Sequence, residues 1–373
     1  MRTTKKKAGK LSAAAQHVFA ALSAQELEPF RAAKQEWSKR LLPRPAAAVV
    51  AHALAAAVSP DPRRNVVGVG IGEKLVDGRT TGIRAIKFFV RTKFPESHLS
   101  AEQVLPRTVN GLPTDVEESG LFRRWAKARP MKGKKAAGAA QRKPAAAATA
   151  PNPRVKMRPA QPGCSVGFRD PADEFVMAGT FGGLVKENAT VYILSNNHVL
   201  ADEGRLAAGA PIFQPGLLDG GNAATDQIAK LTRFINLKTG AANKVDGAIA
   251  EVLRTPDVTR EILQIGPPAG TAAAAIDMLV HKFGRTTSYT AGRVTSIDTD
   301  VSVQYDTGTY TFEEQIIIVG MGGQSFSDAG DSGSLILERD SQQAVGLLFA
   351  GSSTHTIANH IEEVLTALNV TLA

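Results

Sequence analysis

The 373-residue chain contains a single cysteine, Cys164, and this scarcity excludes an intramolecular disulfide framework. A chain without disulfides fits a reducing compartment, so we expect a cytoplasmic protein. Cys164 stands in Pro-Gly-Cys-Ser-Val-Gly, with no histidine beside it in the sequence. We therefore predict a buried small side chain at this position and not a nucleophilic thiol.

Long apolar runs are also missing. No stretch reaches the ~18 apolar residues of a membrane-spanning helix, and the longest candidate, residues 46–58, is interrupted by His52. The basic residues 1–10 are followed by polar positions where a signal peptide would need an apolar region. We predict no secretion signal and no membrane partner.

Signatures of metal and nucleotide sites are absent as well. The seven histidines are scattered and form no HExxH motif, so we expect no metal and no cofactor. Gly68, Gly70 and Gly72 alternate with apolar residues, but this spacing differs from the dinucleotide-binding fingerprint. A turn follows them where that fingerprint needs a helix, which argues against a phosphate site.

The net charge of +9 is concentrated in two stretches. Residues 1–10 hold five basic groups, residues 123–158 hold twelve, and neither stretch contains an acid. The rest of the chain carries 27 basic and 35 acidic residues. The basic stretches allow non-specific contact with nucleic acid. A solvated linker is the simpler interpretation, so we expect no nucleic-acid partner.

Composition divides the chain into four regions. Residues 1–60 predict a helical N-terminal region, in which Ser23 and Glu26 form a capping box. Glycine-rich strands and turns in residues 61–125 predict a small α/β domain. Ala, Pro, Lys and Arg dominate residues 126–162, which predicts a disordered basic linker.

Residues 163–373 are rich in short β-prone runs separated by Gly, Pro, Asn and Asp turns. This density predicts a mainly β fold, either a sandwich or a pair of barrels. An apolar stripe predicts a helix at the end of the chain; it consists of Ile357, Ile361, Val364, Leu365 and Leu368. The predicted strands are residues 176–184, 191–194, 212–213, 228–234, 247–252, 279–280, 292–297, 301–305, 315–319, 334–337 and 345–350.

The candidate nucleophile is Ser332, which stands in Gly330-Asp331-Ser332-Gly333. A nucleophilic serine needs a tight glycine turn, because its hydroxyl must stand clear of the backbone and neighbouring amides must be free to bind an oxyanion. The alternative is an ordinary glycine-rich turn whose Ser and Asp cap local amides.

Two other polar residues lie at the ends of predicted strands. His198 follows the apolar run 191–194, and Asp246 precedes the run 247–252. The order His198, Asp246, Ser332 is the triad order of chymotrypsin-type enzymes and not the Ser-Asp-His order of α/β-hydrolases. Ser334 also occupies the position where the hydrolase turn needs glycine.

Residues 163–373 resemble trypsin-like serine peptidases of the chymotrypsin fold, in particular a bacterial group without disulfides that is related to plant narrow-leaf-type proteases. The resemblance is weaker over residues 64–120 and does not cover residues 1–60. The segments that carry it are LSNNHVLA, NKVDGAIAEV, GRTTSYTAGRV, FSDAGDSGSLIL and GLLFAGSS.

The resemblance implies a double β-barrel and a serine endopeptidase. Ser332 would be the nucleophile, His198 the general base and acid, and Asp246 the residue that orients the imidazole. The amides of Gly330 and Ser332 would form the oxyanion hole. Asp331 has no visible activation N-terminus to pair with, so we expect it to bond internally.

The resemblance also implies where a substrate binds. Phe349, Ala350 and Gly351 would pair with the substrate backbone as an added strand. Phe326 falls at the base of the specificity pocket, and since it is not acidic, an apolar or small side chain is expected before the cut.

The sequence therefore predicts a cofactor-free serine endopeptidase that acts on proteins or peptides. One alternative is a non-catalytic peptide-binding module on the same fold; another is a nucleic-acid-associated protein that uses the basic linker. Whether the chain forms a homo-oligomer remains open. We also expect the N-terminal region to gate the active site, because it precedes a linker exposed to cleavage.

Overall fold

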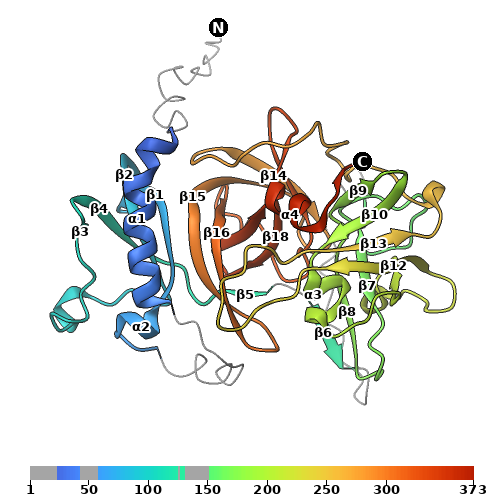
Figure 1. The fold of residues 1–373 in the computed structure, drawn as a ribbon, viewed down its shortest axis with the longest axis horizontal. Coiled ribbons are helices and arrows are strands. Elements are labelled where there is room, and N and C mark those ends of the chain that lie inside the picture. Colours follow the sequence, from blue (N-terminus) through green and yellow to red (C-terminus); the bar gives the residue numbers. More distant parts are fainter. Residues whose placement is uncertain (1–22, 43–57, 125–126, 131–150) are drawn as a thin grey trace, which may run out of the picture.

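The computed structural model describes residues 23–42, 58–124, 127–130 and 151–373. Much of the expected helical region 1–60, namely residues 1–22 and 43–57, lies outside these ranges. Within them the chain is mainly β and forms two sheets, which fit the expected double β-barrel (Figure 1). No helix in the described ranges is both long and apolar enough to cross a bilayer.

The first barrel comes from a nine-stranded sheet in the order β20-β9-β10-β13-β12-β11-β7-β8-β6. Every pairing in this sheet is antiparallel. Its strands are β6 (Lys127–Pro130), β7 (Ser165–Phe168), β8 (Phe175–Thr180), β9 (Gly183–Glu187), β10 (Thr190–Ser195), β11 (Pro211–Phe213), β12 (Gln227–Phe234), β13 (Ala248–Val252) and β20 (Thr371–Leu372).

The second barrel is closed, because β14 pairs with β17 on one side and with β15 on the other. The strands between them run in the order β17-β18-β19-β16-β15. The bounds are β14 (Leu279–Gly284), β15 (Ser288–Gln304), β16 (Thr309–Gly320), β17 (Leu335–Glu338), β18 (Ala344–Gly351) and β19 (His355–His360). Helix α4 (Ile361–Leu368) follows β19 and packs on β18.

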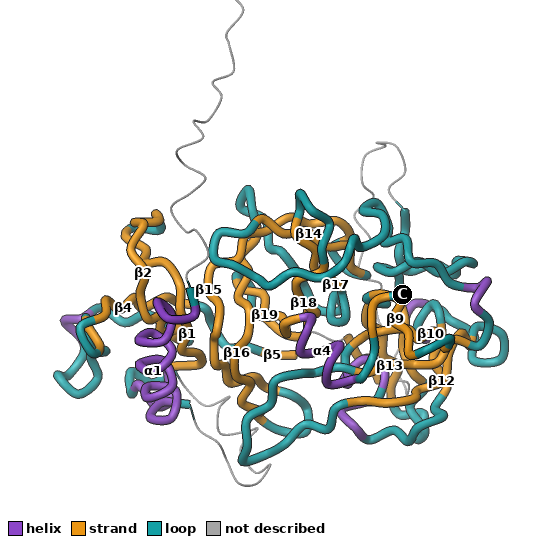
Figure 2. The backbone as a smooth tube through the Cα atoms, turned by 45° about the horizontal axis from the view of Figure 1, so that its top comes forward, coloured by secondary structure: helices purple, strands orange, loops and turns teal. Residues whose placement is uncertain are grey.

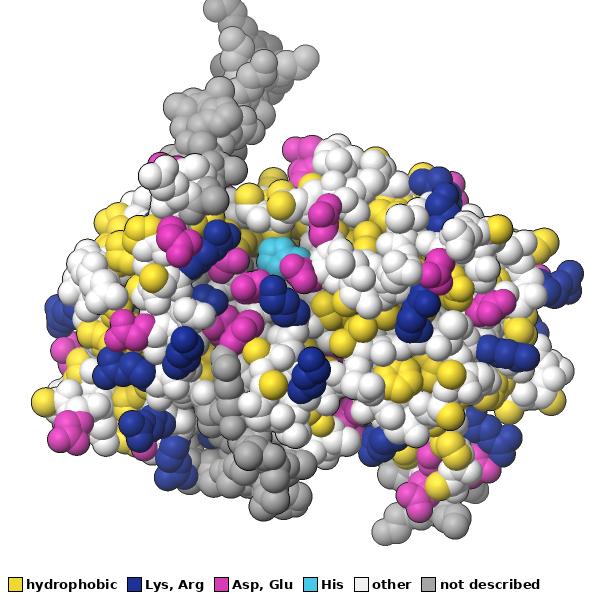
Figure 3. All heavy atoms as spheres, in the orientation of Figure 1, with side chains coloured by type: hydrophobic (Ala, Val, Ile, Leu, Met, Phe, Trp, Pro, Cys, Tyr) yellow, Lys and Arg dark blue, Asp and Glu magenta, His cyan; other side chains and the backbone are white. Residues whose placement is uncertain are grey.

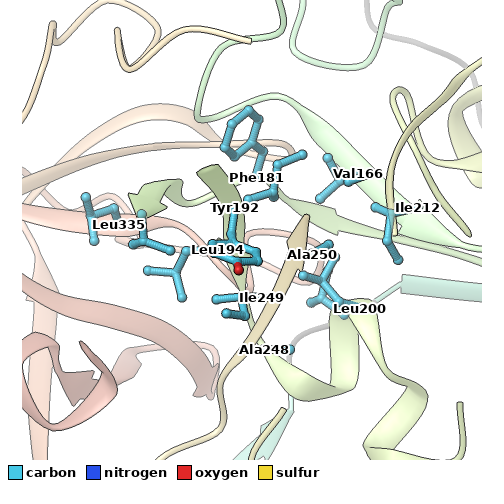
Figure 4. Close-up of a cluster of buried hydrophobic side chains, with 14 of the residues drawn as sticks. Val166, Phe181, Tyr192, Leu194, Leu200, Ile212, Ala248, Ile249, Ala250 and Leu335 are labelled. Carbon is cyan, nitrogen blue, oxygen red and sulfur yellow. The ribbon is translucent and has the colours of Figure 1, made fainter. Parts of the chain in front are cut away.

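One hydrophobic core joins the two barrels. Figure 4 shows side chains of the first barrel, including Val166, Phe181 and Ile249, in one buried cluster with Leu335 of the second. All four are at most 1% exposed. Full burial of such a side chain contributes about 1.5–3 kcal/mol, so this shared core stabilises both barrels.

The N-terminal unit extends the sheet of the second barrel. Its β1 (Val66–Val76) pairs antiparallel with β15, and β2 (Arg79–Val90), β4 (Leu112–Glu118) and β3 (Thr108–Val109) follow in that order. A Cβ on Gly70 would lie 2.4 Å from Oγ1 of Thr299, so the glycine-rich run permits close packing between β1 and β15.

Helix α1 (Ala24–Leu41) covers one face of this added sheet (Figure 1). It begins as predicted, because the side chains of Ser23 and Glu26 form a capping box. Trp37 packs edge-on against Phe88 of β2 at 5.4 Å between ring centroids. Lys34 forms a buried ion pair with Asp300 of β15 at 2.7 Å, so α1 is fixed to the barrel as well as to its own unit. A four-residue helix, α2 (Pro62–Asn65), precedes β1.

The expected linker also differs from the structure. Residues 127–130 form β6, and residues 151–162 pack on the first barrel, where Ala160 is fully buried and its amide donates to Asp257 O at 2.7 Å. The amino-acid composition does not indicate that these segments are ordered, because they are held by backbone hydrogen bonds to strands and loops far away in the sequence. Residues 131–150 lie outside the described ranges.

Four other predicted elements differ from the observed ones. The run 176–184 is divided into β8 and β9, while the runs 292–297 and 301–305 form one long strand, β15. The C-terminal helix begins at Ile361, and Ile357 belongs to β19. Apolar positions spaced by three and four residues cannot tell a buried strand that leads into a helix from a longer helix.

Candidate active site

His198 and Asp246 are brought together by two neighbouring strands. β10 pairs antiparallel with β13, so the end of one strand lies beside the start of the other, with Ser195 opposite Ala248. The short helix α3 (Asn197–Leu200) begins directly after β10 and carries His198. Its Nδ1 lies 2.5 Å from Oδ2 of Asp246, and neither side chain is exposed. The expected pairing of these two residues is therefore present.

Asp246 is a buried carboxylate with several partners. Besides the imidazole, it accepts from the backbone N of His198 at 3.3 Å and from the hydroxyl of Tyr305 at 2.6 Å. Asn359 holds the backbone of Asp246 by accepting from its amide at 3.0 Å. Burial raises the pKa of Asp246, but His198 and these hydrogen bonds outweigh it and leave the pKa below its ordinary value. The side chain is therefore an anion.

Sequence reasoning did not find Tyr305 or Asn359. Tyr305 stands just after β15, and Asn359 lies in β19. Both belong to the second barrel and lie more than 100 residues after His198 in the chain. Burial and the nearby Asp246 carboxylate raise the pKa of Tyr305 well above its usual value, so its hydroxyl stays protonated and donates. No spacing in the sequence signals either contact.

The free ring nitrogen of His198 has the property that a general base needs. With the proton on Nδ1, which faces Asp246, Nε2 is an acceptor. Nε2 is buried and has no hydrogen-bond partner among the described residues. An unpaired buried acceptor costs free energy, and this is usually found where a substrate or reacting group completes the site.

Ser332 lies in a turn that contacts the end of β10. Gly330 and Gly333 have φ angles of +103° and +93°, a region in which glycine is favoured. A Cβ on Gly333 would lie 2.1 Å from Oγ of Ser195, which is three residues before His198. The amide of Thr180 donates to the carbonyl of Ser332 at 2.8 Å. The fold thus places the nucleophile candidate next to the strand that leads into α3.

The hydroxyl of Ser332 does not bond His198 in this structure. Its Oγ donates to the carbonyl of Phe349 at 3.1 Å, and the side chain is fully buried. Among the described residues the structure therefore joins His198 to Asp246 and leaves the third member of the predicted triad bonded elsewhere. Rotation about the Cα–Cβ bond of a serine exchanges such partners between staggered positions.

The expected oxyanion donors are free. Within the part of the chain that the structure describes, the amides of Gly330 and Ser332 donate no hydrogen bond, whereas the intervening amide of Asp331 donates to Asp328 O at 3.0 Å. Gly333 donates to Leu348 O at 2.8 Å. Two unpaired amides on either side of a paired one form a suitable site for a negatively charged oxygen.

Asp331 bonds internally, as predicted. It accepts from the amides of Thr286 and Thr287 at 2.8 and 3.1 Å, and from the amide of Asp328 at 3.0 Å. Its cation could not be predicted from residue spacing: Lys282 Nζ lies 3.4 Å from Oδ2 of Asp331, and both side chains are fully buried. This pair ties the serine turn to β14.

The proposed substrate-binding residues have mainly structural side chains. Phe326 is 1% exposed and belongs to a core cluster with Val280 and Ile318, so its ring does not line a cavity. Phe349 and Ala350 are also fully buried, which leaves only the backbone edge of β18 for pairing. A cavity of about 680 Å³ lies beside Phe326, and its lining is Thr287, Tyr289, Thr290, Ala291, Met321, Gln324, Ser325, Ser327, Asp328 and Ser353.

Two other titratable residues lie away from this chemistry. Cys164 is fully buried, as predicted, and burial raises the pKa of its thiol to about 12. His355 lies in β19, and its Nε2 is 3.0 Å from Oε1 of Glu117. No group of three or more His, Cys, Asp or Glu side chains suited to a metal occurs within the described ranges.

No protein-family model matches the chain, and no curated protein matches it. Among solved structures, it is similar to Thermobifida fusca Protease A, with 16% identity, a TM-score of 0.41, and coverage of 57% of this chain and 97% of that chain. It is also similar to Nocardiopsis protease, with 15% identity, a TM-score of 0.41, and coverage of 57% of this chain and 99% of that chain. A third similar structure is the alpha-lytic protease homolog N4, with 20% identity, a TM-score of 0.38, and coverage of 57% of this chain and 98% of that chain.

Proposed function

We propose that the chain is a serine endopeptidase in which Ser332 attacks a peptide carbonyl and His198 accepts its proton. The same imidazole then donates that proton to the leaving amine, and an acyl-enzyme forms at Ser332. His198 next activates the water that hydrolyses the acyl-enzyme. Asp246 stabilises the imidazolium throughout, and the amides of Gly330 and Ser332 bind the negative oxygen of each tetrahedral intermediate.

The observation that carries this proposal is the buried imidazole of His198, which has a carboxylate partner on one ring nitrogen and no partner among the described residues on the other. His198 Nδ1 faces Asp246 at 2.5 Å, while its Nε2 has no partner among the described residues. Unpaired amides of the Gly330–Gly333 turn lie in the same part of the fold. A purely structural histidine would be expected to have both ring nitrogens paired.

A non-catalytic peptide-binding module is the second candidate, and one observation favours it. The Ser332 hydroxyl donates to Phe349 O and leaves His198 Nε2 without a hydrogen bond. A protein that had lost hydrolysis could keep the β18 edge for peptide binding in this state.

Labelling with a fluorophosphonate tests the two candidates. The peptidase should be modified at Ser332, and Ser332→Ala should abolish the modification. Ser334→Ala is the matched control, because Ser334 is a buried serine in the same turn whose hydroxyl bonds only Asp331 O among the described residues. Intact protein that stays unmodified at Ser332 under conditions that label a control serine peptidase would contradict hydrolysis.

The proposed substrates are proteins or peptides, and we propose that the enzyme acts in the cytoplasm. The nucleic-acid alternative has less support, since two basic residues that suggested it are paired with acids: Arg124 with Glu203 and Lys156 with Asp226. On the face seen in Figure 3, basic and acidic side chains are interspersed over both barrels.

A further inference from the structure

The backbone edge predicted to bind substrate is occupied by the chain itself. β5 (Arg123–Arg124) pairs antiparallel with the end of β18, with Arg124 opposite Ala350 and Arg123 opposite Gly351. On its other side β5 meets β15, where the amide of Gln304 donates to Phe122 O at 3.0 Å. Figures 1 and 2 show β5 in the middle of the molecule, between the N-terminal unit and the first barrel.

The next described strand pairs with the first barrel. β6 begins at Lys127, three positions after Arg124, and pairs antiparallel with β8. β8 ends at Thr180, whose amide bonds the carbonyl of Ser332. β5 lies on β18, whose Phe349 carbonyl accepts from Ser332 Oγ. The described strands before and after residues 125–126 thus pair with β18 and β8, the two strands that hydrogen-bond Ser332. Pairing with a strand edge is also the way in which an extended peptide binds.

Arg124 is held by two acids close to α3. Its Nε lies 2.7 Å from Oε1 of Glu203, which is 1% exposed, and its Nη2 pairs with Asp306. Glu203 lies three residues after Leu200, the end of the helix that carries His198, and has a φ angle of +57°, which is uncommon for a residue other than glycine. The acids are therefore part of the His198 side of the site.

Phe122 fixes the other end of this segment. Its side chain is fully buried in a cluster with Phe89, Tyr305 and Phe349, and it lies 6.3 Å from the ring of Phe89. Arg123 is exposed and has no ion pair among the described residues. The segment is therefore held by backbone pairing, by an aromatic anchor and by the two ion pairs of Arg124, which are contacts of the kind that hold a peptide in an interface.

We propose that β5 occupies the position of a substrate strand, so that the full chain is an autoinhibited peptidase, and that Glu203 and Asp306 form a subsite for a basic side chain. The proposal rests on the proposed function. A substrate must displace β5 to pair with β18, and an extended segment with Arg or Lys at the position of Arg124 is best suited to replace it.

The test measures hydrolysis of a fluorogenic peptide by three full-length chains. Arg124→Glu puts a like charge against Glu203 and Asp306 and should expel β5, raising hydrolysis at least about tenfold. Arg123→Glu is the matched control, because it makes the same charge change at an exposed neighbour and should leave the rate within about twofold. Thermal unfolding of each chain verifies folding. If Arg124→Glu does not fold, Glu203→Gln replaces it, since glutamine keeps the size of the side chain and can still accept from the amide of Thr307.

Fluorophosphonate labelling separates this proposal from the proposed function. Equal hydrolysis by all three chains, with Ser332 labelled in each, would overturn occupancy by β5 and leave the peptidase standing. Unlabelled Ser332 in every folded chain would remove the peptidase and the autoinhibition together.

A synthetic peptide tests the basic subsite directly. Residues 119–124, Ser-Gly-Leu-Phe-Arg-Arg, should inhibit the released enzyme in competition with substrate. The same peptide with Glu at the last position should be at least about tenfold weaker. Equal inhibition by both peptides would contradict a subsite made by Glu203 and Asp306.

Discussion

Tyr305 extends the His198–Asp246 pair into a chain of three side chains. Its ring lies 5.8 Å from the imidazole and is stacked on Phe312 at 6.0 Å, so the hydroxyl is held in place by aromatic packing. It donates to the same Oδ2 atom that faces His198. Asp246 therefore keeps two strong partners on one oxygen, and this fixes its orientation.

Tyr305→Phe should slow the reaction and leave the fold intact. The loss of one hydrogen bond to a charged group costs about 1.5 kcal/mol, so the rate of Ser332 labelling should fall about tenfold. Tyr310→Phe is the control, because its hydroxyl bonds Thr307 and not Asp246. Equal labelling rates for the two variants would show that Tyr305 only packs.

His198 and Asp246 could be predicted because each lies at the end of an apolar run, and the order of the polar residues narrowed the chemistry. Tyr305 could not, because its role depends on a hydrogen bond to Asp246, which is 59 residues away in the chain. The position of the Ser332 hydroxyl could not be predicted either, because the amino-acid sequence does not specify which rotamer a serine side chain adopts.

At the scale of elements, the turn Gly330–Gly333, which carries Ser332, is held against β14 by a buried ion pair. Lys282 Nζ lies 3.4 Å from Oδ2 of Asp331, and it also donates to Ser288 O at 3.1 Å. Burial lowers the pKa of Lys282, and the Asp331 carboxylate opposes that shift. The turn that presents the candidate oxyanion amides thus depends on a cation from another strand.

Lys282→Met should destabilise the protein markedly. Removal of one member of a buried pair leaves an uncompensated charge, and the free energy of unfolding should fall by about 3 kcal/mol. Lys244→Met is the control, because the Lys244–Glu314 pair is half exposed, 47% on each side, and should contribute less than about 1 kcal/mol. Denaturant unfolding measures both values. A similar small loss in the two variants would contradict the role assigned to Lys282.

Most strands of the two barrels could be predicted from apolar runs and turn residues. β5 could not, because it consists of two arginines, and its strand conformation comes entirely from the edges of β15 and β18. β6 was concealed in the same way by a basic composition. Short edge strands take their structure from the partner sheet and not from their own side chains.

At the scale of the molecule, the N-terminal unit and the second barrel share a polar joint. His355 of β19 lies 3.0 Å from Glu117 of β4, and Lys87 of β2 lies 2.5 Å from the other oxygen of Glu117. Burial raises the pKa of Glu117, but His355 and Lys87 outweigh it and lower the pKa to about 2. The joint therefore depends on an ionised Glu117.

Acid should weaken this joint. A carboxyl whose pKa is lower in the folded state stabilises the fold fully above the unfolded value of 4.5, and the contribution is lost as the pH falls toward 2. The difference corresponds to about 3 kcal/mol. Glu117→Gln should flatten the pH dependence of the free energy of unfolding between pH 4.5 and 2, whereas Glu118→Gln, at an exposed neighbour, should not. Identical curves for the two variants would contradict this assignment.

The shared sheet also decides what a break in the backbone would do. β1 and β5 hydrogen-bond to strands of the second barrel, and β6 to a strand of the first. Residues 131–150 connect β6 to the rest of the first barrel along the chain. A nick in that stretch would cut the polypeptide, but the two fragments would stay associated. Strands of the N-terminal fragment are hydrogen-bonded to strands of the C-terminal fragment in both barrels.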